Sequence, residues 1–180
     1  MMFYCFLADG FEEIEALATI DILRRADIPV TTVGVDGDVI CGAHDICVTA
    51  DMLIGDFEFD EDALGVILPG GMPGVKNLYA DETVRNAVSY CESRKLYLCA
   101  ICAAPSILGR MGVLEGKKAT CFPGFEEELK GAEVTGEKVV VDGNIITAKG
   151  AGCALDFGFT IVSQVQSKED ADRIASSMQC

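Results

Sequence analysis

The stretch "LYLCAICAAPSILGRMG", residues 96–112, changes character at its centre, and this change indicates the fold. The apolar, β-favouring run from Leu96 to Ile101 predicts a strand, and the small residues after Cys102 lead through Pro105 into a helical pattern. A strand that passes directly into a helix is typical of α/β proteins. The thiol of Cys102 therefore lies at a strand-to-helix joint.

Strand-like and helix-like segments alternate along the rest of the chain. We predict strands in "MFYCFLA", "IPVTTVGV" and "LGVILPGG", short strands near 119–121, 138–141 and 144–148, and helices in "EEIEALATIDILRRA", "DETVRNAVSYCESR", near 154–165 and from 168 onward. Such alternation implies a mostly parallel sheet with helices on both faces. The pair Asp142-Gly143 predicts a small β-hairpin. The predicted fold class is α/β, a three-layer sandwich.

The composition bounds the number of domains, the partners and the location. With 180 residues, 50% of them hydrophobic, the chain can form one core, so we predict a single domain over residues 1–180. The formal net charge of -15 disfavours nucleic acid and anionic membranes as partners, because both are polyanions. No run approaches the ~20 apolar residues of a membrane helix, and the first residues do not resemble a signal peptide. We predict a cytoplasmic protein.

The nine cysteines are scattered through apolar runs, and their number is odd. Without an export signal, we expect all of them to be reduced thiols. The run "CAIC" has the spacing of a redox motif, but that motif normally opens a helix. Cys99 lies within the predicted strand, where side chains three apart point to opposite faces, so we predict a core position for Cys99.

Cys102 is a candidate nucleophile because of its place in the fold. A thiol at the end of a strand and the start of a helix has backbone N–H groups and the helix dipole directed at its sulfur, which favours the thiolate. A tight nucleophile elbow needs small neighbours, and Ala103 and Ala104 meet this need. A buried structural cysteine is the alternative, since free cysteine is among the most buried residue types.

Glu15 is a candidate partner for this thiol. In the helix "EEIEALATIDILRRA", a step of about 100° per residue places Glu15 on the same side as Ile22 and Ala26. Burial would raise the pKa of Glu15 and leave it protonated, able to donate to a thiolate or to move a proton. For Glu12 and Glu13 we expect only a favourable interaction with the helix dipole.

The segments that follow four predicted strands should meet at one edge of the sheet, where sites form in such folds. They are "LADGFEE", "LPGGMPG", "ICAAP" and "AKGAGCA". Gly70 and Gly71 suit an oxyanion hole, because glycine lets a backbone N–H approach a ligand closely; a simple turn is the alternative. Gly150 and Cys153, in the last segment, are possible lining residues.

Cofactor motifs are incomplete. The run "GGMPGVK" lacks the Lys-Ser/Thr pair of a phosphate loop, and "GAGCAL" lacks the third glycine of the dinucleotide fingerprint. With His44 as its one histidine and no clustered cysteine pairs, the chain offers no zinc ligand set. We predict neither a metal nor a cofactor.

Several motifs together resemble the ThiJ/PfpI superfamily, in particular its DJ-one-like branch, over essentially the whole chain. They are "GFEEIEA", "RRADIPVTT", "VILPGGMPG", "AICAAP" and "DFGF", in matching order and spacing. The resemblance implies a flavodoxin-like sandwich of the class I glutamine amidotransferase type, usually a homodimer. It also implies that Cys102 is the reactive cysteine, Glu15 the carboxylic acid beside it, and Gly71 and Ala103 the backbone donors.

The resemblance implies two classes of function. The first is an enzyme of the glyoxalase III or deglycase kind, in which Cys102 attacks a small aldehyde such as methylglyoxal or a glycated adduct and Glu15 moves the proton. The second is a non-catalytic oxidative-stress sensor or chaperone-like protein that uses oxidation of Cys102. Family members also carry a label linking them to thiamine biosynthesis.

Two positions depart from the family pattern. Members proposed as peptidases have a histidine directly after the nucleophile, where this chain has Ala103, so a cysteine peptidase is disfavoured. Glyoxalase members often have a histidine in the segment aligned with "TCFPGF", where this chain has Phe122. Base catalysis then falls to Glu15, His44 or water. His44 either reaches the site, across a dimer in one arrangement, or is a surface loop histidine.

Overall fold

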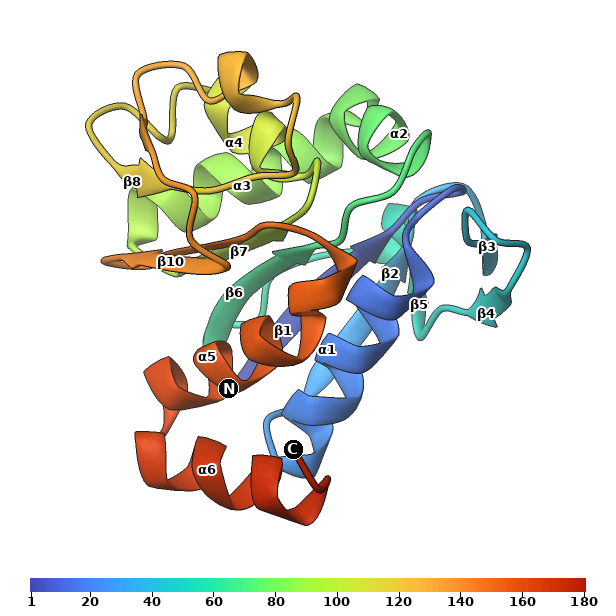
Figure 1. Cartoon of the computed structure of the whole chain (residues 1–180). Coiled ribbons are helices and arrows are strands. Elements are labelled where there is room, and N and C mark those ends of the chain that lie inside the picture. The colour runs from blue at the N-terminus through green and yellow to red at the C-terminus, as the bar shows by residue number, and fades with distance from the viewer.

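The structure is a computed structural model that describes all residues from 1 to 180. Its centre is a seven-stranded sheet in the order β10-β11-β7-β6-β1-β2-β5 (Figure 1). The strands are β1 (Met2–Leu7), β2 (Val30–Gly34), β5 (Met52–Leu53), β6 (Ala63–Leu68), β7 (Tyr97–Ile101), β10 (Val139–Asp142) and β11 (Ile145–Ala148). Only β10 runs antiparallel, and it pairs with β11 through the hairpin predicted at Asp142-Gly143. The α/β prediction is confirmed.

Helices cover both faces of the sheet, and each face has its own hydrophobic core. One face carries α1 (Glu13–Arg25), α5 (Ala154–Val165) and α6 (Lys168–Ser177), and the other α2 (Gly74–Ala80), α3 (Glu82–Arg94) and α4 (Pro105–Arg110) (Figure 1). Side chains alternate along β1, so Phe3 and Leu7 pack in the first core while Tyr4 and Phe6 pack in the second. The three-layer sandwich follows from this alternation.

Several short elements were not predicted. Strands β3 (Val39–Cys41) and β4 (Cys47–Thr49) form a separate hairpin beside the main sheet, and β9 (Glu133–Val134) pairs with β8 (Lys118–Ala119), which lies at the short strand predicted near 119–121. Three 3-10 turns lie at Ile54–Asp56, Glu126–Glu128 and Ala151–Cys153. Strands of two or three residues are too short to show a period-two pattern, so sequence periodicity could not reveal them.

The expectation that every cysteine is reduced is wrong for two of them. Cys41 and Cys47 form a disulfide across the β3–β4 hairpin, whose register places them directly opposite each other. Cys99 is buried in the core, as predicted. The other cysteines, all free, are Cys5, Cys91, Cys99, Cys102, Cys121, Cys153 and Cys180. The disulfide depends on the hairpin register, which the sequence pattern does not disclose.

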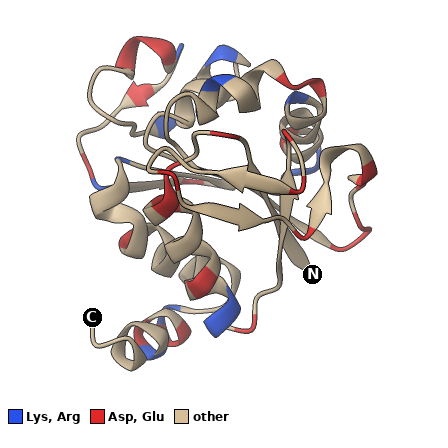
Figure 2. Cartoon of the chain, turned by 90° about the vertical axis from the view of Figure 1, so that its right-hand side faces the viewer, with Lys and Arg blue, Asp and Glu red and all other residues tan.

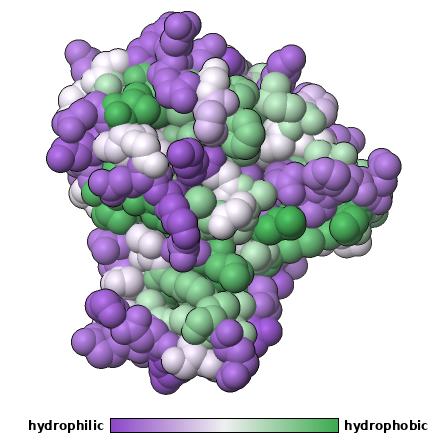
Figure 3. Space-filling view, viewed as in Figure 1, coloured by the Kyte–Doolittle hydropathy of each residue, from purple (hydrophilic) through white to green (hydrophobic).

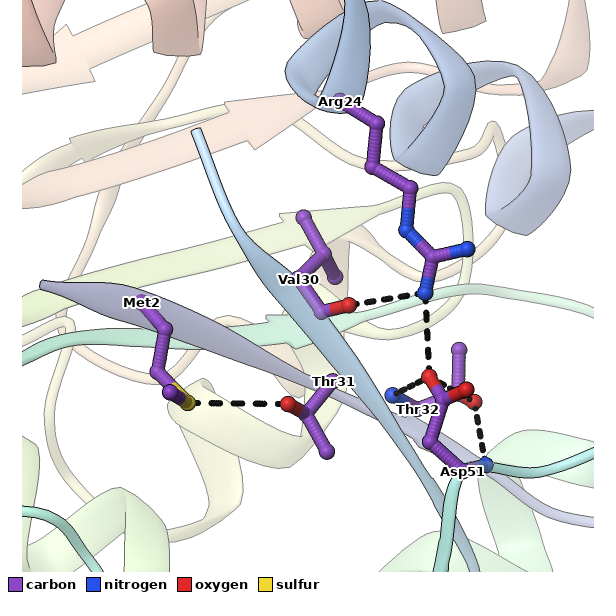
Figure 4. A network of polar contacts seen from close by, with 6 residues as sticks. All are labelled: Met2, Arg24, Val30, Thr31, Thr32 and Asp51. Atoms are coloured by element: carbon purple, nitrogen blue, oxygen red, sulfur yellow. Dashed lines mark hydrogen bonds and ion pairs between the residues drawn. The ribbon is translucent and has the colours of Figure 1, made fainter. Parts of the chain in front are cut away.

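The end of α1 is joined to the edge of the sheet through Asp51 (Figure 4). Its carboxylate accepts hydrogen bonds from the Thr32 backbone N–H and hydroxyl at 2.9 Å and forms an ion pair with Arg24 at 3.0 Å. Arg24 also donates to the Val30 carbonyl at 2.8 Å. These contacts fix the C-terminal end of α1 against the beginning of β2. The N-terminal end of α1 therefore lies near the carboxyl ends of the parallel strands.

Acidic residues are spread over many elements of the chain instead of gathering in one segment, as the red parts of the ribbon in Figure 2 show. None of the helices is both long and apolar enough to cross a membrane.

Close packing between α1 and α5 gives a prediction about stability. A Cβ at Gly158 on α5 would lie 2.8 Å from the end of the Ile22 side chain and 3.1 Å from its Cβ. We expect Gly158→Val to lower the free energy of unfolding by about 1–3 kcal/mol, because overpacking forces the two helices apart. Urea unfolding measures this change. The control is Gln164→Val, at an exposed position of the same helix, and equal losses in both variants would contradict the prediction.

Candidate active site

The strand order favours a ligand site at the carboxyl ends of the parallel strands. The chain passes from β1 to β2 on one side and from β6 to β7 on the other, so the connections after β1 and β6 leave in opposite directions. In open α/β sheets, ligands bind at such a switch point, beyond the carboxyl ends of the strands. Glu15 follows β1, Gly70 follows β6 and Cys102 follows β7, so all three candidates lie at this edge.

Gly70 is where the three meet. Its backbone N–H donates to Oε2 of Glu15 at 2.8 Å. A Cβ at this position would lie 2.5 Å from the same oxygen and 2.6 Å from Cβ of Cys102. A glycine is required because the Glu15 carboxyl and Cys102 occupy the space that a side chain would need. A simple turn would not bring a carboxyl and a cysteine this close to Gly70. The close packing therefore favours the interpretation of Gly70 as part of a site.

Cys102 has the geometry of a nucleophile elbow. Its φ of 65° lies in the left-handed region, which residues other than glycine rarely adopt. The strained turn is held on both sides, because the Cys102 N–H donates to Ala148 and its carbonyl accepts from the Phe122 N–H, each at 2.8 Å. The residue is partly exposed, unlike Cys5 or Cys99. A cysteine that only filled the core would not require this conformation.

Glu15 faces inward, as the helical pattern predicted, and is 1% exposed. Burial raises its pKa to about 7, while the contact with Cys102 and the Gly70 N–H limit the rise. Oε2 is satisfied by Gly70, but Oε1 is buried without a hydrogen-bond partner. A buried carboxylate oxygen without a donor is costly. The neutral, protonated form of Glu15 is therefore favoured by its surroundings.

The pKa of Cys102 differs from the sequence expectation of an acidic thiol. Burial, and then the neighbouring Glu15 carboxylate, raise it to about 12, although the backbone N–H groups of Ala103 and Gly71 favour the thiolate. The expectation took Glu15 as a neutral hydrogen-bond donor, whereas an ionised Glu15 opposes the thiolate, and α4, the helix that starts beside the sulfur, has only six residues. Beside an ionised Glu15 the thiolate is disfavoured, so in the wild-type protein Cys102 loses its proton most easily when that proton passes to Glu15.

Gly71, whose backbone N–H hydrogen-bonds to Cys102, packs closely against the backbone of the segment after β1. Its φ is 92°, and a Cβ there would lie 2.5 Å from the Gly10 carbonyl oxygen and 2.6 Å from the Phe11 carbonyl carbon. The Glu12 N–H also donates to the Gly70 carbonyl at 2.9 Å. The segment after β1 and the segment after β6 are thus in direct backbone contact beside the thiol.

The remaining lining candidates divide into two groups. Phe122 lies next to the site, since its N–H bonds to Cys102, and a Cβ at Gly150 would lie 3.2 Å from the Phe122 ring. Cys153 follows Gly150 in a 3-10 turn and is a free thiol, without a bond to Cys102. The largest surface cavity, about 340 Å³, lies elsewhere, between Phe57 and Tyr90. The candidate active site is thus identified by the contacts among Glu15, Gly70 and Cys102 and not by a large cavity.

His44 does not contact Cys102 but reaches the start of α1. Its Nδ1 lies 2.9 Å from Oε2 of Glu13 and 3.5 Å from Oε2 of Glu12. Glu13 is 4% exposed and also accepts the His44 backbone N–H at 2.6 Å, so the expectation of a purely dipole-related Glu13 is wrong. The helical wheel places Glu13 outward, but the β3–β4 hairpin covers that side. The hydrogen bond to Glu13 and the charges of both carboxylates raise the pKa of His44.

Glu12, Glu13 and His44 are the residues that could hold a metal ion, since one donor atom of each lies within 4.8 Å of the others. The sequence does not reveal this cluster, because it holds one histidine and no cysteine and His44 lies about thirty residues from the two carboxylates. The hairpin already occupies the Glu13 carboxylate.

Comparison with known proteins identifies the family of this fold and site. The DJ-1/PfpI family pattern matches residues 2–164. Protein DJ-1 homolog A of Arabidopsis thaliana is 38% identical over 174 residues, covering 94% of this chain and 44% of that protein. Protein dj-1beta of Drosophila melanogaster is 33% identical over 175 residues, covering 96% of this chain and 93% of that protein. The chain belongs to the DJ-1/PfpI family.

A solved structure described as "Toxoplasma gondii DJ-1, oxidized" has a TM-score of 0.94 to this chain at 30% identity, and the match covers 99% of this chain and 97% of that one. The chain spans less than half the length of two Arabidopsis thaliana relatives, 44% of DJ-1 homolog A and 40% of DJ-1 homolog B. The resemblance to the ThiJ/PfpI superfamily is thus confirmed at the level of the family and the fold.

The raised pKa of Glu15 predicts how stability depends on pH. In the unfolded chain this carboxyl titrates near 4.5, and in the folded protein near 7, so the folded state binds more protons between these values. The free energy of unfolding should therefore fall, by up to about 3 kcal/mol, as the pH rises through this window. Glu15→Gln should lack this decline.

Urea unfolding over a pH series tests this prediction. The quantity compared is the difference in unfolding free energy between wild type and Glu15→Gln, which removes the contributions of other titrating groups. Glu169→Gln, at an exposed carboxyl of α6, is the control and should follow the wild type. Parallel curves for wild type and Glu15→Gln would show that Glu15 titrates normally.

Proposed function

We propose that this protein acts on small 2-oxoaldehydes, or on their adducts, through Cys102 with Glu15 as the proton carrier. The observation that carries the proposal is the junction at Gly70, where a buried carboxyl with a raised pKa and an elbow cysteine are held against one backbone N–H. Membership of the DJ-1/PfpI family supports it.

The first step forms a bond between sulfur and carbon. As the Cys102 sulfur adds to the aldehyde carbon, its proton passes to the Glu15 carboxylate. The aldehyde oxygen gains the negative charge, and the N–H groups of Gly71 and Ala103, which hydrogen-bond to the sulfur, are the donors that would stabilise it. Because the pKa of Glu15 is about 7, this carboxyl can accept a proton near neutral pH and return it to the oxygen, giving a hemithioacetal.

The second step moves a proton within the bound substrate. Glu15 removes the proton from the former aldehyde carbon, and a proton returns to the neighbouring ketone carbon. The hydroxyl proton on the former aldehyde oxygen moves to the ketone oxygen, so the product is a 2-hydroxy acid held as a thioester on Cys102, which water cleaves to restore the thiol. The sum of these steps adds one water to the 2-oxoaldehyde and needs no oxidant or reductant.

We expect this turnover to be slow. Phe122 offers no imidazole beside Cys102, and His44 is bound to Glu12 and Glu13 instead of the thiol. Glu15 is left to carry every proton. A second general acid or base typically contributes about 10²- to 10⁴-fold in rate, so its absence leaves weak activity.

Formation of lactate from methylglyoxal, in buffer free of amines and thiols, tests the proposal. We expect Cys102→Ala to abolish turnover and Glu15→Gln to lower it by about 10²- to 10⁴-fold, because the nucleophile and the proton carrier are lost in turn. Phe122→His should raise the rate if the ring turns toward the substrate. The control is Cys180→Ala, which removes an exposed thiol at the C-terminus.

Equal rates for wild type and Cys102→Ala would remove the enzymatic proposal. Full activity of Glu15→Gln would remove Glu15 from the mechanism but leave a role for the thiol.

A redox sensor is the second candidate, and the donors around the sulfur favour it. The N–H groups of Gly71 and Ala103 and neutral Glu15 can hydrogen-bond to oxygens added to Cys102. In this function two molecules of peroxide each give one oxygen atom to the thiol and leave as water, so that Cys102 becomes a sulfinic acid.

Glu15→Gln distinguishes the sensor from the enzyme, because it should speed oxidation of Cys102 but slow aldehyde turnover. Loss of the carboxylate lowers the pKa of Cys102, and the thiolate fraction rises about tenfold for each unit lowered. We expect mild peroxide to add two oxygens to Cys102 in wild type, and faster in Glu15→Gln, while turnover falls. Mass mapping measures the rates, and a Cys102–Cys153 disulfide in place of the sulfinic acid would contradict this prediction.

The setting of this function is also a proposal. We propose one domain, a cytoplasmic location and a homodimer. The family supports the dimer, and so does the apolar surface that runs from the start of α1 to the β3–β4 hairpin (Figure 3). On it, Ile14 is 58% and Ile46 54% exposed. Covering these side chains with a second copy would stabilise the pair.

A further inference from the structure

We propose that the Cys41–Cys47 disulfide is a reversible redox clamp that controls access to Cys102. The disulfide closes the tip of the β3–β4 hairpin, residues 42–46, which lies on the start of α1. Closed, the tip holds the segment that carries Glu15. Reduced, the tip opens and Cys102 becomes more accessible. This inference concerns the thiol itself and does not depend on aldehyde turnover.

The hairpin is the kind of element whose stability depends on a crosslink. It is a two-stranded sheet of its own, with three residues in each strand, and shares no strand with the central sheet. Two-stranded hairpins are marginally stable alone. Ile40 is fully buried and anchors the base, whereas Cys47 and Ile46 are exposed. Loss of the disulfide would therefore release the tip and leave the base in place.

The tip and Cys41, the residue that precedes it, make direct contacts with the segment after β1. The Gly10 N–H donates to the Cys41 carbonyl at 2.8 Å, and the Ala43 N–H donates to the Phe11 carbonyl at 2.8 Å. The Cys41 N–H donates to Oδ1 of Asp9 at 2.9 Å. Cys41 itself thus supplies two of these bonds, and movement at the disulfide reaches this segment without an intervening element.

Glu13 is the strongest link between the tip and α1. Three donors to its buried carboxylate come from the tip: the backbone N–H and the ring of His44 and, at 3.5 Å, the Ile46 N–H. A Cβ at Gly42 would collide with this carboxylate, so the tip packs tightly on it. If the tip opens, the carboxylate loses its donors and must be hydrated, because a buried charge without partners is costly.

The same segment forms one wall of the Cys102 site. Glu12 donates to the Gly70 carbonyl at 2.9 Å, and Gly71 is packed against the backbone of Gly10 and Phe11. Glu15, in the first turn of α1, accepts the Gly70 N–H at 2.8 Å. An opening that hydrates Glu13 therefore loosens the contacts that keep Gly71 and Glu15 against the thiol.

The redox step is thiol–disulfide exchange with a small-molecule disulfide, such as oxidised glutathione. The thiolate of one cysteine attacks the small disulfide and releases one small thiol, and the second cysteine then attacks the mixed disulfide and releases the other. Cys41 and Cys47 lose two electrons and two protons in total, and the small disulfide gains them. Disulfides in cytosolic proteins are usually transient or redox-sensing, which fits a pair in a chain with free cysteines elsewhere.

The test compares the rate at which iodoacetamide labels Cys102 in two states of the wild-type protein. One is oxidised with glutathione disulfide, and the other is reduced and freed of reductant; peptide mass mapping reports the Cys41–Cys47 link and the label on Cys102. We expect reduction to raise the labelling rate of Cys102 by about threefold or more, since local opening exposes a protected group.

Two variants make the test specific. The double variant Cys41→Ser/Cys47→Ser should label at the rate of the reduced wild type under both conditions. Cys180→Ser removes an exposed thiol far along the chain and should keep the full difference. Equal rates in the oxidised and reduced wild type, or no Cys41–Cys47 link after oxidation, would overturn the clamp. Loss of lactate formation with an intact difference in labelling would overturn only the enzymatic proposal.

Discussion

The absence of a side chain at residue 70 is the constraint on which the site depends. The Gly70 backbone comes so close to the Glu15 carboxyl and to Cys102 that no Cβ fits between them. This approach is possible because β6 lies between β1 and β7 in the sheet, so the segments that follow the three strands converge. The carboxyl is buried by the same convergence, and burial is what raises its pKa to about 7. The order of the strands therefore determines both the need for glycine at residue 70 and the raised pKa of Glu15.

Backbone N–H groups supply most of the hydrogen bonds to the Glu15 carboxyl and the Cys102 sulfur. Gly70 binds the carboxyl, and Gly71 and Ala103 direct N–H groups at the sulfur. Side chains supply only the thiol and one exchangeable proton. A site built in this way is preorganised by the fold, since the sheet fixes backbone dipoles without the entropy loss of ordering long side chains. It is also sensitive to small backbone shifts, which is why contacts at the edge of the segment after β1 matter.

Much of this could be predicted from the sequence where the signal is local. The joint at Cys102, the inward direction of Glu15 and the hairpin at Asp142-Gly143 all follow from periodicity or turn chemistry within a few residues. Glu13 could not be placed, because its burial comes from a hairpin about thirty residues further along the chain that its own helix does not disclose. The Cys41–Cys47 pair likewise depends on a three-residue register.

The pKa of Cys102 shows a different limit. The sequence gives the order of elements, from which a helix start beside the sulfur follows, and this feature favours the thiolate. The opposing effect comes from Glu15 on another element, and it depends on how close that carboxyl lies and on whether it is ionised, which a local pattern does not encode. When two effects of opposite sign act on one group, a local pattern can reveal each of them but not which is larger.

The outer strands of the sheet have a consequence for how this protein behaves in crowded solution. β5 has two residues and β10 has four, and the Asp142 carboxylate at the end of β10 accepts the Lys118 N–H at 2.9 Å. Short edges leave few unpaired backbone groups, and a charged residue at the end of one opposes the approach of a foreign strand. The sheet therefore ends at both sides in a form that resists extension into fibrils, even though its interior strands are among the most apolar parts of the chain.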